Sequence, residues 1–141
     1  MTPRTPPCAA WRFLLRWPGI CGSVCGAMEK TLFQKIADKE IPSDMVYEDE
    51  MCVAFRDISP SAPVHILLVP RKPLRDIACA TAEDAALLSH LMLKVGDIAR
   101  AAGIAESGFR TVLNTGEDGG QTVPHLHIHI IGGRSMQWPP G

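Results

Sequence analysis

The sequence predicts an α+β domain in which an antiparallel sheet of about five strands carries one long and one short helix. Five short segments rich in branched apolar residues lie along the chain without helices regularly placed between them, which is typical of an antiparallel sheet. One longer segment, residues 82–102, has apolar residues at helical spacing. The length of 141 residues suits one core and is too short for two ordinary domains.

The short helix precedes the first strand. Thr31 followed by Gln34 forms a capping-box pattern, and the helix is expected to reach about Ala37. The strands are expected near Met45 to Tyr47, Cys52 to Asp57, Val64 to Pro70, Phe109 to Asn114 and Leu126 to Ile131.

The long helix is predicted over about Ala82 to Ala102. Thr81 is its expected N-cap, and Gly103 is expected to end it. Its apolar face should cover the sheet with Leu87, Leu88, Leu91, Val95 and Ile98.

The first 27 residues differ from the rest in composition. They hold three of the 14 basic residues and no acid, so residues 28–141 carry a net charge of −4. We expect residues 1–27 to be a disordered extension or a mis-assigned start, and residues 28–141 to form the domain. The alternative is an organellar transit peptide, which is also basic and poor in acids. The expected location is accordingly cytoplasmic, or organellar if that alternative holds.

Composition also argues against several classes of function. No apolar run is long enough to span a bilayer, so no membrane association is expected. An acidic body without a basic stripe argues against binding a nucleic acid polymer. Five irregularly spaced cysteines are not a disulfide framework. Cys21 and Cys25 are a weak metal pair, and Cys52 is expected to be a small buried apolar residue.

Three of the five histidines alternate with branched apolar residues over residues 125–131. The period of a strand places Leu126 and its apolar successors in the core and lines His125, His127 and His129 along the opposite face. Imidazoles supply nucleophiles and proton donors near neutral pH, so this row suits phosphoryl or nucleotidyl transfer.

A zinc site is the rival interpretation of the histidine row. On a straight strand, His125 and His129 are about 13 Å apart, too far to share one ion. A site with two histidines would need His65 or a cysteine as a further ligand, and the common zinc spacings are missing. We therefore expect no metal.

Glycine-rich segments flank the row at residues 114–122 and 132–133. Glycine lets main-chain amides approach a phosphate closely. Side-chain donors for an oxyanion are expected from Asn114, Gln121 and Thr122.

The pattern at residues 125–131 is the defining motif of the histidine-triad nucleotide-binding proteins, and the chain resembles their Hint branch from about Glu29 to Gly141. Several separated blocks carry the resemblance in the same order: Thr31 to Ile36, Lys39 to Pro42, Val53 to Pro60, Ala62 to His65 and Gly132 to Gly141.

The resemblance implies hydrolysis of purine nucleoside 5′-phosphoramidates, conjugates of AMP or GMP with an amine, through a nucleotidyl-histidine on His127. His125 and His129 would bind the phosphate, and His65 would assist proton transfer. It also implies a homodimer and no cofactor. Two alternatives remain open: cleavage of dinucleoside polyphosphates or nucleotidyl transfer by the same nucleophile, and a nucleotide-binding regulatory module.

The matching family positions also imply a nucleotide pocket. Asp57 would accept hydrogen bonds from the ribose hydroxyls, and Trp138 resembles a residue in a tail that reaches toward the partner's active site in the dimer. Thr122 stands where that branch often has Ser, and Pro124 where it has Tyr. The expected apolar walls of the purine site are Leu32, Phe33, Ile36, Ile41, Phe55 and Ile58. Taken alone, each aliphatic residue among them is better explained as part of the core, and only the matching family positions imply a role in the pocket.

Overall fold

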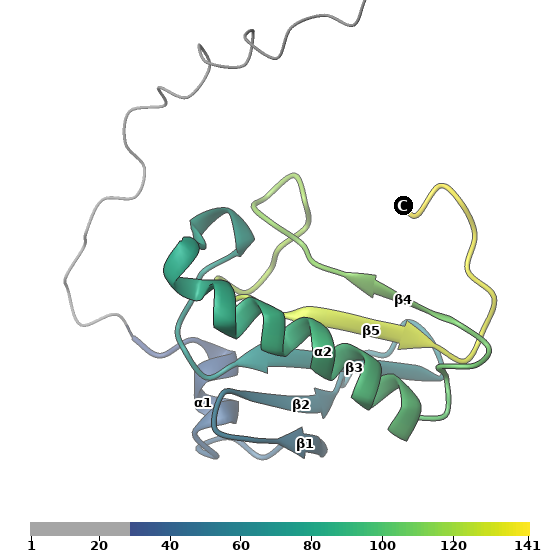
Figure 1. Ribbon diagram of the computed structural model, residues 1–141, viewed down its shortest axis with the longest axis horizontal. Coiled ribbons are helices and arrows are strands. Elements are labelled where there is room, and N and C mark those ends of the chain that lie inside the picture. The colour runs from purple at the N-terminus through teal and green to yellow at the C-terminus, as the bar shows by residue number, and fades with distance from the viewer. Residues whose placement is uncertain (1–28) are drawn as a thin grey trace, which may run out of the picture.

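A computed structural model describes residues 29–141. At its centre is one antiparallel sheet of five strands in the order β1-β2-β3-β5-β4 (Figure 1), which confirms the predicted fold class. The interpretations of residues 1–27 and of the cysteines in them lie outside the described residues. The strands are β1 (Met45–Glu48), β2 (Cys52–Arg56), β3 (Val64–Pro70), β4 (Phe109–Val112) and β5 (Ile128–Gly132).

α2 (Ala85–Ala101) lies across one face of the sheet (Figure 1). The 3₁₀ turn η2 (Ala82–Asp84) precedes it, so the α-helix begins later than the predicted residue 82. The Asp84 carboxylate accepts from the Thr81 N–H at 2.9 Å, and this capping box tightens the first turn. The helix ends before Gly103, whose φ of +72° suits glycine. A second 3₁₀ turn, η1 (Ile77–Cys79), was not expected from the sequence.

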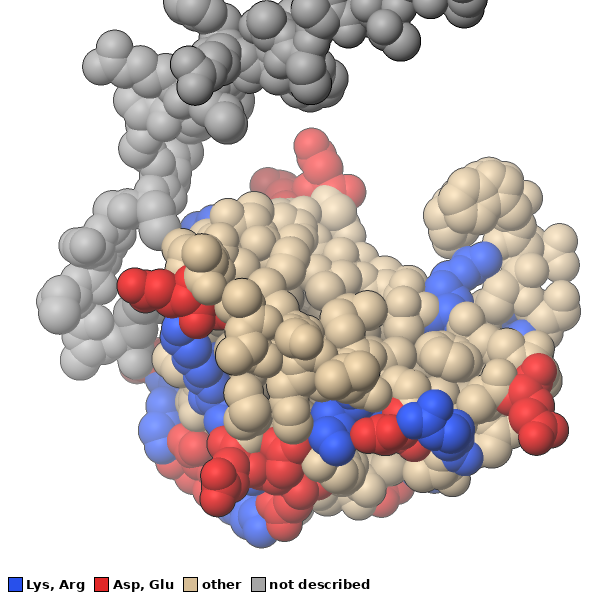
Figure 2. All heavy atoms as spheres, viewed as in Figure 1, with Lys and Arg blue, Asp and Glu red and all other residues tan. Residues whose placement is uncertain are grey.

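The main core lies between α2 and the sheet. Leu91 and Ile98 from the helix and Ile130 from β5 are almost completely buried there, and burial stabilises each such side chain by about 1.5–3 kcal/mol. As predicted, the apolar residues that alternate with the histidines belong to this core: Leu126, Ile128 and Ile130. The outward face of α2 exposes Met92 and Leu93 and is uncharged over its first half, whereas its later turns carry the ion pairs of Lys94 and Arg100 with Asp97 (Figure 2).

α1 (Leu32–Ala37) covers the opposite face of the sheet with a second apolar cluster. Its N-cap is Thr31, whose hydroxyl accepts from the Gln34 N–H at 3.1 Å. The reciprocal arm of the predicted capping box is absent, because the Gln34 side chain donates to Asp38 instead. The buried members of the cluster are Phe33, Ile36, Ala37, Val53, Phe55, Leu67 and Val69.

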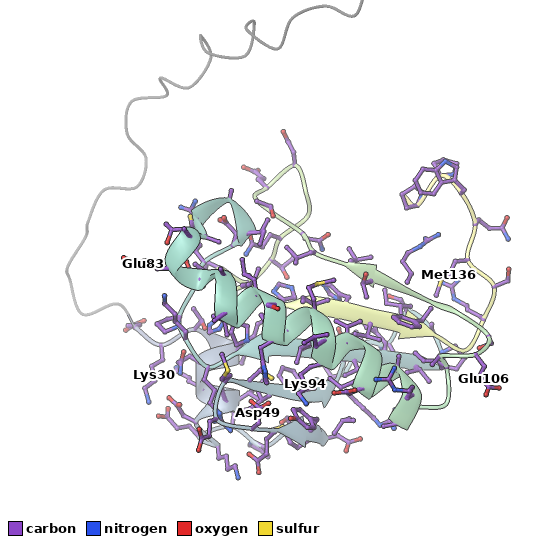
Figure 3. The ribbon with its side chains drawn as sticks, in the orientation of Figure 1. Lys30, Asp49, Glu83, Lys94, Glu106 and Met136 are labelled. Carbon is purple, nitrogen blue, oxygen red and sulfur yellow. The ribbon has the colours of Figure 1, made fainter. Side chains whose placement is uncertain are left out.

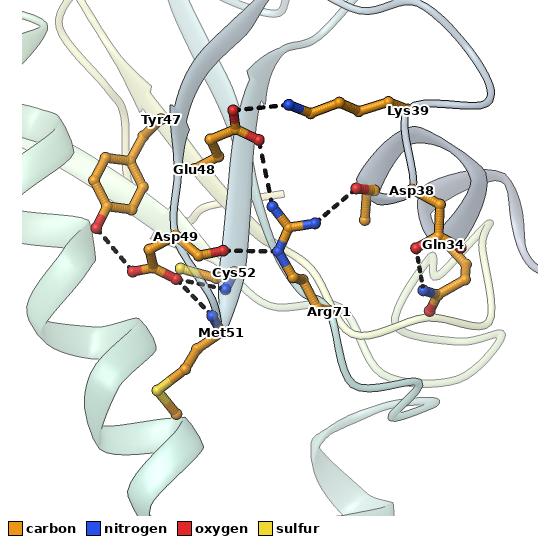
Figure 4. A network of polar contacts seen from close by, with 10 residues as sticks. Gln34, Asp38, Lys39, Tyr47, Glu48, Asp49, Met51, Cys52 and Arg71 are labelled. Atoms are coloured by element: carbon orange, nitrogen blue, oxygen red, sulfur yellow. Dashed lines mark hydrogen bonds and ion pairs between the residues drawn. The ribbon is translucent and has the colours of Figure 1, made fainter.

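Arg71, directly after β3, ties α1 to the turn between β1 and β2 (Figure 4). Its guanidinium donates to the carbonyls of Ala37 and Asp49, each at 2.7 Å, and to the Glu48 carboxylate at 3.3 Å. The last turn of a helix leaves carbonyls without intrahelical partners. Arg71 therefore fixes the C-terminal end of α1 against the sheet.

The strand predicted from Leu126 begins two residues later, at Ile128. The N–H groups of His125 and Leu126 bond to Val123 and Leu74 instead of to β3. The first two histidines thus lie in an irregular segment that leads into β5, and only His129 lies on the strand. The ends of β2 and β4 also fall short of the predicted Asp57 and Asn114.

Candidate active site

His127 is the central residue of the candidate site. Its side chain is buried, and its Nδ1–H donates to the carbonyl of His125 at 2.7 Å. A neutral imidazole with its proton on Nδ1 has a lone pair on Nε2, and the described residues give that nitrogen no hydrogen-bond partner. The ring packs edge-on against Phe33, with centroids 4.8 Å apart. His127 therefore combines a held ring with an available nucleophilic nitrogen.

His65 and His129 meet because of the register of β3 and β5. Leu67 pairs with His129 across the two strands, and His65 lies two residues before Leu67 on the same face. Nε2 of His65 is 2.9 Å from Nδ1 of His129, and Nδ1 of His65 accepts from the Ser61 N–H at 3.0 Å.

These partners assign the tautomers of both rings. Because Nδ1 of His65 is an acceptor, its proton lies on Nε2 and is donated to Nδ1 of His129. The proton of His129 then lies on Nε2, which is buried and has no partner. The His127 and His129 rings are 4.9 Å apart. An unpartnered buried donor beside an imidazole with a free lone pair suits a bound oxyanion.

His125 makes different contacts from those of the other two. Its Nε2 donates to the Pro70 carbonyl at 2.8 Å, and its Nδ1 is 3.0 Å from the Thr31 hydroxyl. Both ring nitrogens of this almost completely buried residue are thus bonded within the protein. His125 has no free N–H for the phosphate contact expected from the sequence.

Burial also sets the charge state of the row. Burial, followed by the nearby His127 and His65, lowers the pKa of His129 to about 4, and Asp57 opposes this only weakly. Burial likewise lowers the pKa of His125, against the bond to Pro70. Both rings are therefore neutral near pH 7, and His129 can act as a hydrogen-bond donor without carrying charge.

The loop before the histidines is closed by Gln121. Its side-chain oxygen accepts from the Gly116 N–H at 3.0 Å, and its nitrogen donates to the carbonyls of Arg75 and Val123. The side chain therefore shapes the loop and has no free donor. Thr122 is exposed and Asn114 half-buried. A recess beside this loop is lined by Arg75, Asp76, Gly116, Glu117, Gly120, Gln121, Thr122 and Pro124.

The predicted purine walls fall into two groups. Phe33, Ile36 and Phe55 belong to the buried cluster under α1, with Ile41 packed against it. Leu32 is half exposed, Ile58 is 98% exposed and Trp138 is 84% exposed. Asp57 accepts from the Ser59 N–H through Oδ1, and its Oδ2 is 3.5 Å from Nε2 of His65. The described chain thus brings the aromatic residues to the histidines but leaves Ile58 and Trp138 at the surface.

Two groups of side chains among residues 29–141 are close enough to share a metal ion. Asp57, His65 and His129 form one, but the imidazole bond already described occupies the nitrogens that face each other. The other joins Asp49, Cys52 and His90 between β2 and α2; Figure 3 shows Asp49 beneath the helix.

Hydrogen bonds account for the second group as well. The Asp49 carboxylate accepts from Tyr47, His90 and the N–H groups of Met51 and Cys52, each at 2.7–2.8 Å. Burial acts to raise the pKa of Asp49, but these donors outweigh it and hold that pKa well below its usual range. Burial raises the pKa of the Cys52 thiol to about 12, as expected for an inert buried cysteine. This group is a structural clasp.

Sequence reasoning missed three contacts that build the site: the Thr31 hydroxyl, the Ser61 N–H and the Pro70 carbonyl. Two are backbone groups, which carry no residue-type signal. Thr31 is recognisable as an N-cap, but its contact with His125 spans 94 residues and has no local pattern.

Three histidines alternating into β5 of such a sheet place the protein in the histidine-triad class. The family model of the HIT domain matches residues 38–136, and the chain belongs to this family. It is similar to uncharacterized HIT-like proteins of Synechococcus elongatus and Synechocystis sp., at 59% and 55% identity over 113 residues, 80% of this chain and 98% of each relative.

Solved structures give the same result. A HIT family hydrolase from Legionella pneumophila has 45% identity and a TM-score of 0.77, covering 78% of this chain and 98% of that one. A histidine triad protein from Clostridium difficile has 42% identity and a TM-score of 0.75, covering 78% and 97%. No helix within residues 29–141 is long and apolar enough to cross a membrane.

Proposed function

We propose that this protein hydrolyses purine nucleoside 5′-phosphoramidates, releasing a nucleoside monophosphate and an amine, as a member of the Hint branch of its family. One observation carries the proposal: Nε2 of His127 is left as a free lone pair by the bond from its Nδ1–H to the His125 carbonyl. The hydrolase and histidine triad proteins among its structural relatives support the broader reaction class.

The reaction has two displacements at phosphorus. Nε2 of His127 attacks the α-phosphorus as the bond to the amine nitrogen breaks, and that nitrogen takes up one proton from solvent as the amine leaves. Water then attacks the nucleotidyl-histidine and returns one proton to solvent, and the nucleoside monophosphate leaves as His127 recovers its lone pair. In both steps the Nε2–H of His129 donates to the phosphate, which supplies the partner that this buried donor lacks.

Recognition of the nucleotide is assigned to the pocket residues inferred from sequence. The aromatic residues of the α1 cluster lie beside His127, which supports a base or ribose site at this edge of the sheet. Asp57 would bind the ribose through Oδ2, since its Oδ1 is used in a turn. Asn114 and Thr122 would meet the phosphate from the loop, with Gln121 shaping the loop around them.

A homodimer is part of the proposal. β4 is an edge strand of the sheet, and α2 exposes the apolar side chains of Met92 and Leu93. An open strand edge and exposed apolar side chains each favour association with another chain. The exposed Trp138 in the C-terminal tail would then reach the partner's site.

The test uses adenosine 5′-monophosphate joined to a fluorescent amine, with and without a chelator. We expect the wild type to release the amine in both conditions, and His127→Ala to bind AMP without releasing it. His90→Ala, which alters a histidine outside the row, is the matched control and should retain activity. Diadenosine polyphosphate is supplied in parallel. Cleavage of that compound alone, or nucleotide binding without turnover, would contradict the proposal.

A further inference from the structure

Thr31 connects α1 to the histidine row. Its hydroxyl accepts from the Gln34 N–H at 3.1 Å, which caps the helix, and it lies 3.0 Å from Nδ1 of His125. Because Nε2 of His125 donates to the Pro70 carbonyl, Nδ1 of the neutral ring is an acceptor. The single hydroxyl proton of Thr31 is therefore donated to His125.

The contact between Thr31 and His125 also affects His127, the proposed nucleophile. The carbonyl of His125 accepts the Nδ1–H of His127 at 2.7 Å, and this bond keeps the lone pair on Nε2. A ring held at both nitrogens fixes the backbone of its own residue. The orientation and tautomer of His127 thus depend on how firmly His125 is held between Thr31 and Pro70.

We propose that Thr31 is a positioning residue for the reaction, acting through His125 to hold His127 in the reactive tautomer. This rests on the proposed function for its kinetic consequence, but the tautomers can be measured without any turnover. His125 then acts as a support within the protein, and its two ring nitrogens bond to Thr31 and Pro70 instead of to the substrate.

The competing explanation is that Thr31 only caps α1. Loss of an N-cap threonine destabilises the helix, which would lower the melting temperature without changing any imidazole. Thr81 provides a matched control, because it is the N-cap before α2 and its side chain bonds only to Asp84 among the described residues. Thr81→Val removes the same groups at a distance from the histidines.

The substitutions separate the two roles of Thr31. Thr31→Val removes both the cap and the donor, and Thr31→Ser retains both. Thr31→Asp keeps a good cap but presents a carboxylate, which cannot donate to Nδ1 of His125. Thr31→Asp therefore tests the donor in a protein whose helix is still capped, even if Thr31→Val does not fold.

Two measurements are made on each variant. NMR of the imidazole nitrogens reports which nitrogen carries the proton, and rapid-quench kinetics report the rate of nucleotidylation of His127. In the wild type, Thr31→Ser and Thr81→Val, we expect His125 protonated on Nε2 and His127 on Nδ1. In Thr31→Asp and Thr31→Val, the ring of His125 should lose this state, and His127 should populate both tautomers.

Nucleotidylation should slow about tenfold in those two variants, since small misplacements of a reacting group can lower rates by up to about 100-fold. AMP affinity should stay within about twofold. Unchanged tautomers in Thr31→Asp, or equal behaviour of Thr31→Val and Thr81→Val, would overturn the proposal. A wild type that shows the expected tautomers but turns over no phosphoramidate would instead overturn the proposed function.

Discussion

Acidification should destabilise the fold through His129, and the size of the effect follows from its burial. The pKa of this residue is about 4 in the folded chain and about 6.5 when unperturbed. Between these values the unfolded chain binds a proton that the folded chain does not, so stability falls as pH drops through this interval. At about 1.4 kcal/mol per pKa unit, the complete loss is at most about 3 kcal/mol.

The assay is urea unfolding at several pH values between about 7 and 4.5, with His129→Gln as the comparison. Glutamine keeps an N–H donor but does not titrate. Over this range the wild type should lose about 2–3 kcal/mol more unfolding free energy than the variant. His125, whose pKa burial also lowers, remains in both proteins, so its effect cancels. Equal pH slopes in the two proteins would refute the assignment of a half-buried, neutral His129.

Three substitutions test the surroundings of the site. Phe33→Leu removes the ring that packs against His127, the proposed nucleophile, so stability should fall by about 1–2 kcal/mol and single-turnover rates should drop; an unchanged rate would contradict this role. Arg71→Met leaves the carbonyls of Ala37 and Asp49 unpaired, so the free energy of unfolding measured in urea should fall by about 1–3 kcal/mol. Lys39→Met is the control, because it breaks only an exposed ion pair and should have no measurable effect. Gly132→Ala places a Cβ 2.8 Å from an Ile104 side-chain atom, and this overpacking should destabilise the fold by about 1–3 kcal/mol and lower the melting temperature. AMP binding by the folded fraction should persist. An unchanged melting temperature would show that the Ile104 side chain moves aside to accommodate the methyl group.

The strands and their faces could be predicted because alternation is a local signal. Val64–Pro70 is identical in sequence analysis and structure, since this central strand is covered on both faces and, apart from His65, is a continuous apolar run. The ends of helices and strands are harder to predict from the sequence. An α-helix and a 3₁₀ turn share the same capping residues, so Thr81 indicates a helical start without indicating that Ala85 is the first α-helical residue.

The site could be predicted only in part, because periodicity is a local signal and the contacts of the histidines are not. Periodicity indicates which face the histidines occupy, but it treats the three rings as equivalent. What distinguishes them is their partners: a hydroxyl and a carbonyl for His125, a carbonyl for His127 and another imidazole for His129. Those partners are mostly remote in sequence or belong to the backbone, and only folding brings them together.

The bond from His127 to the carbonyl two residues earlier has a consequence for evolution of the site. The immediate partner of the His127 Nδ1–H is a main-chain carbonyl, so side chains such as Thr31 support this proton only indirectly, through His125. Under the proposed function, residues around the substrate can therefore be exchanged one at a time while Nε2 of His127 is retained. Such an arrangement allows relatives to acquire different substrates around an unchanged reaction centre.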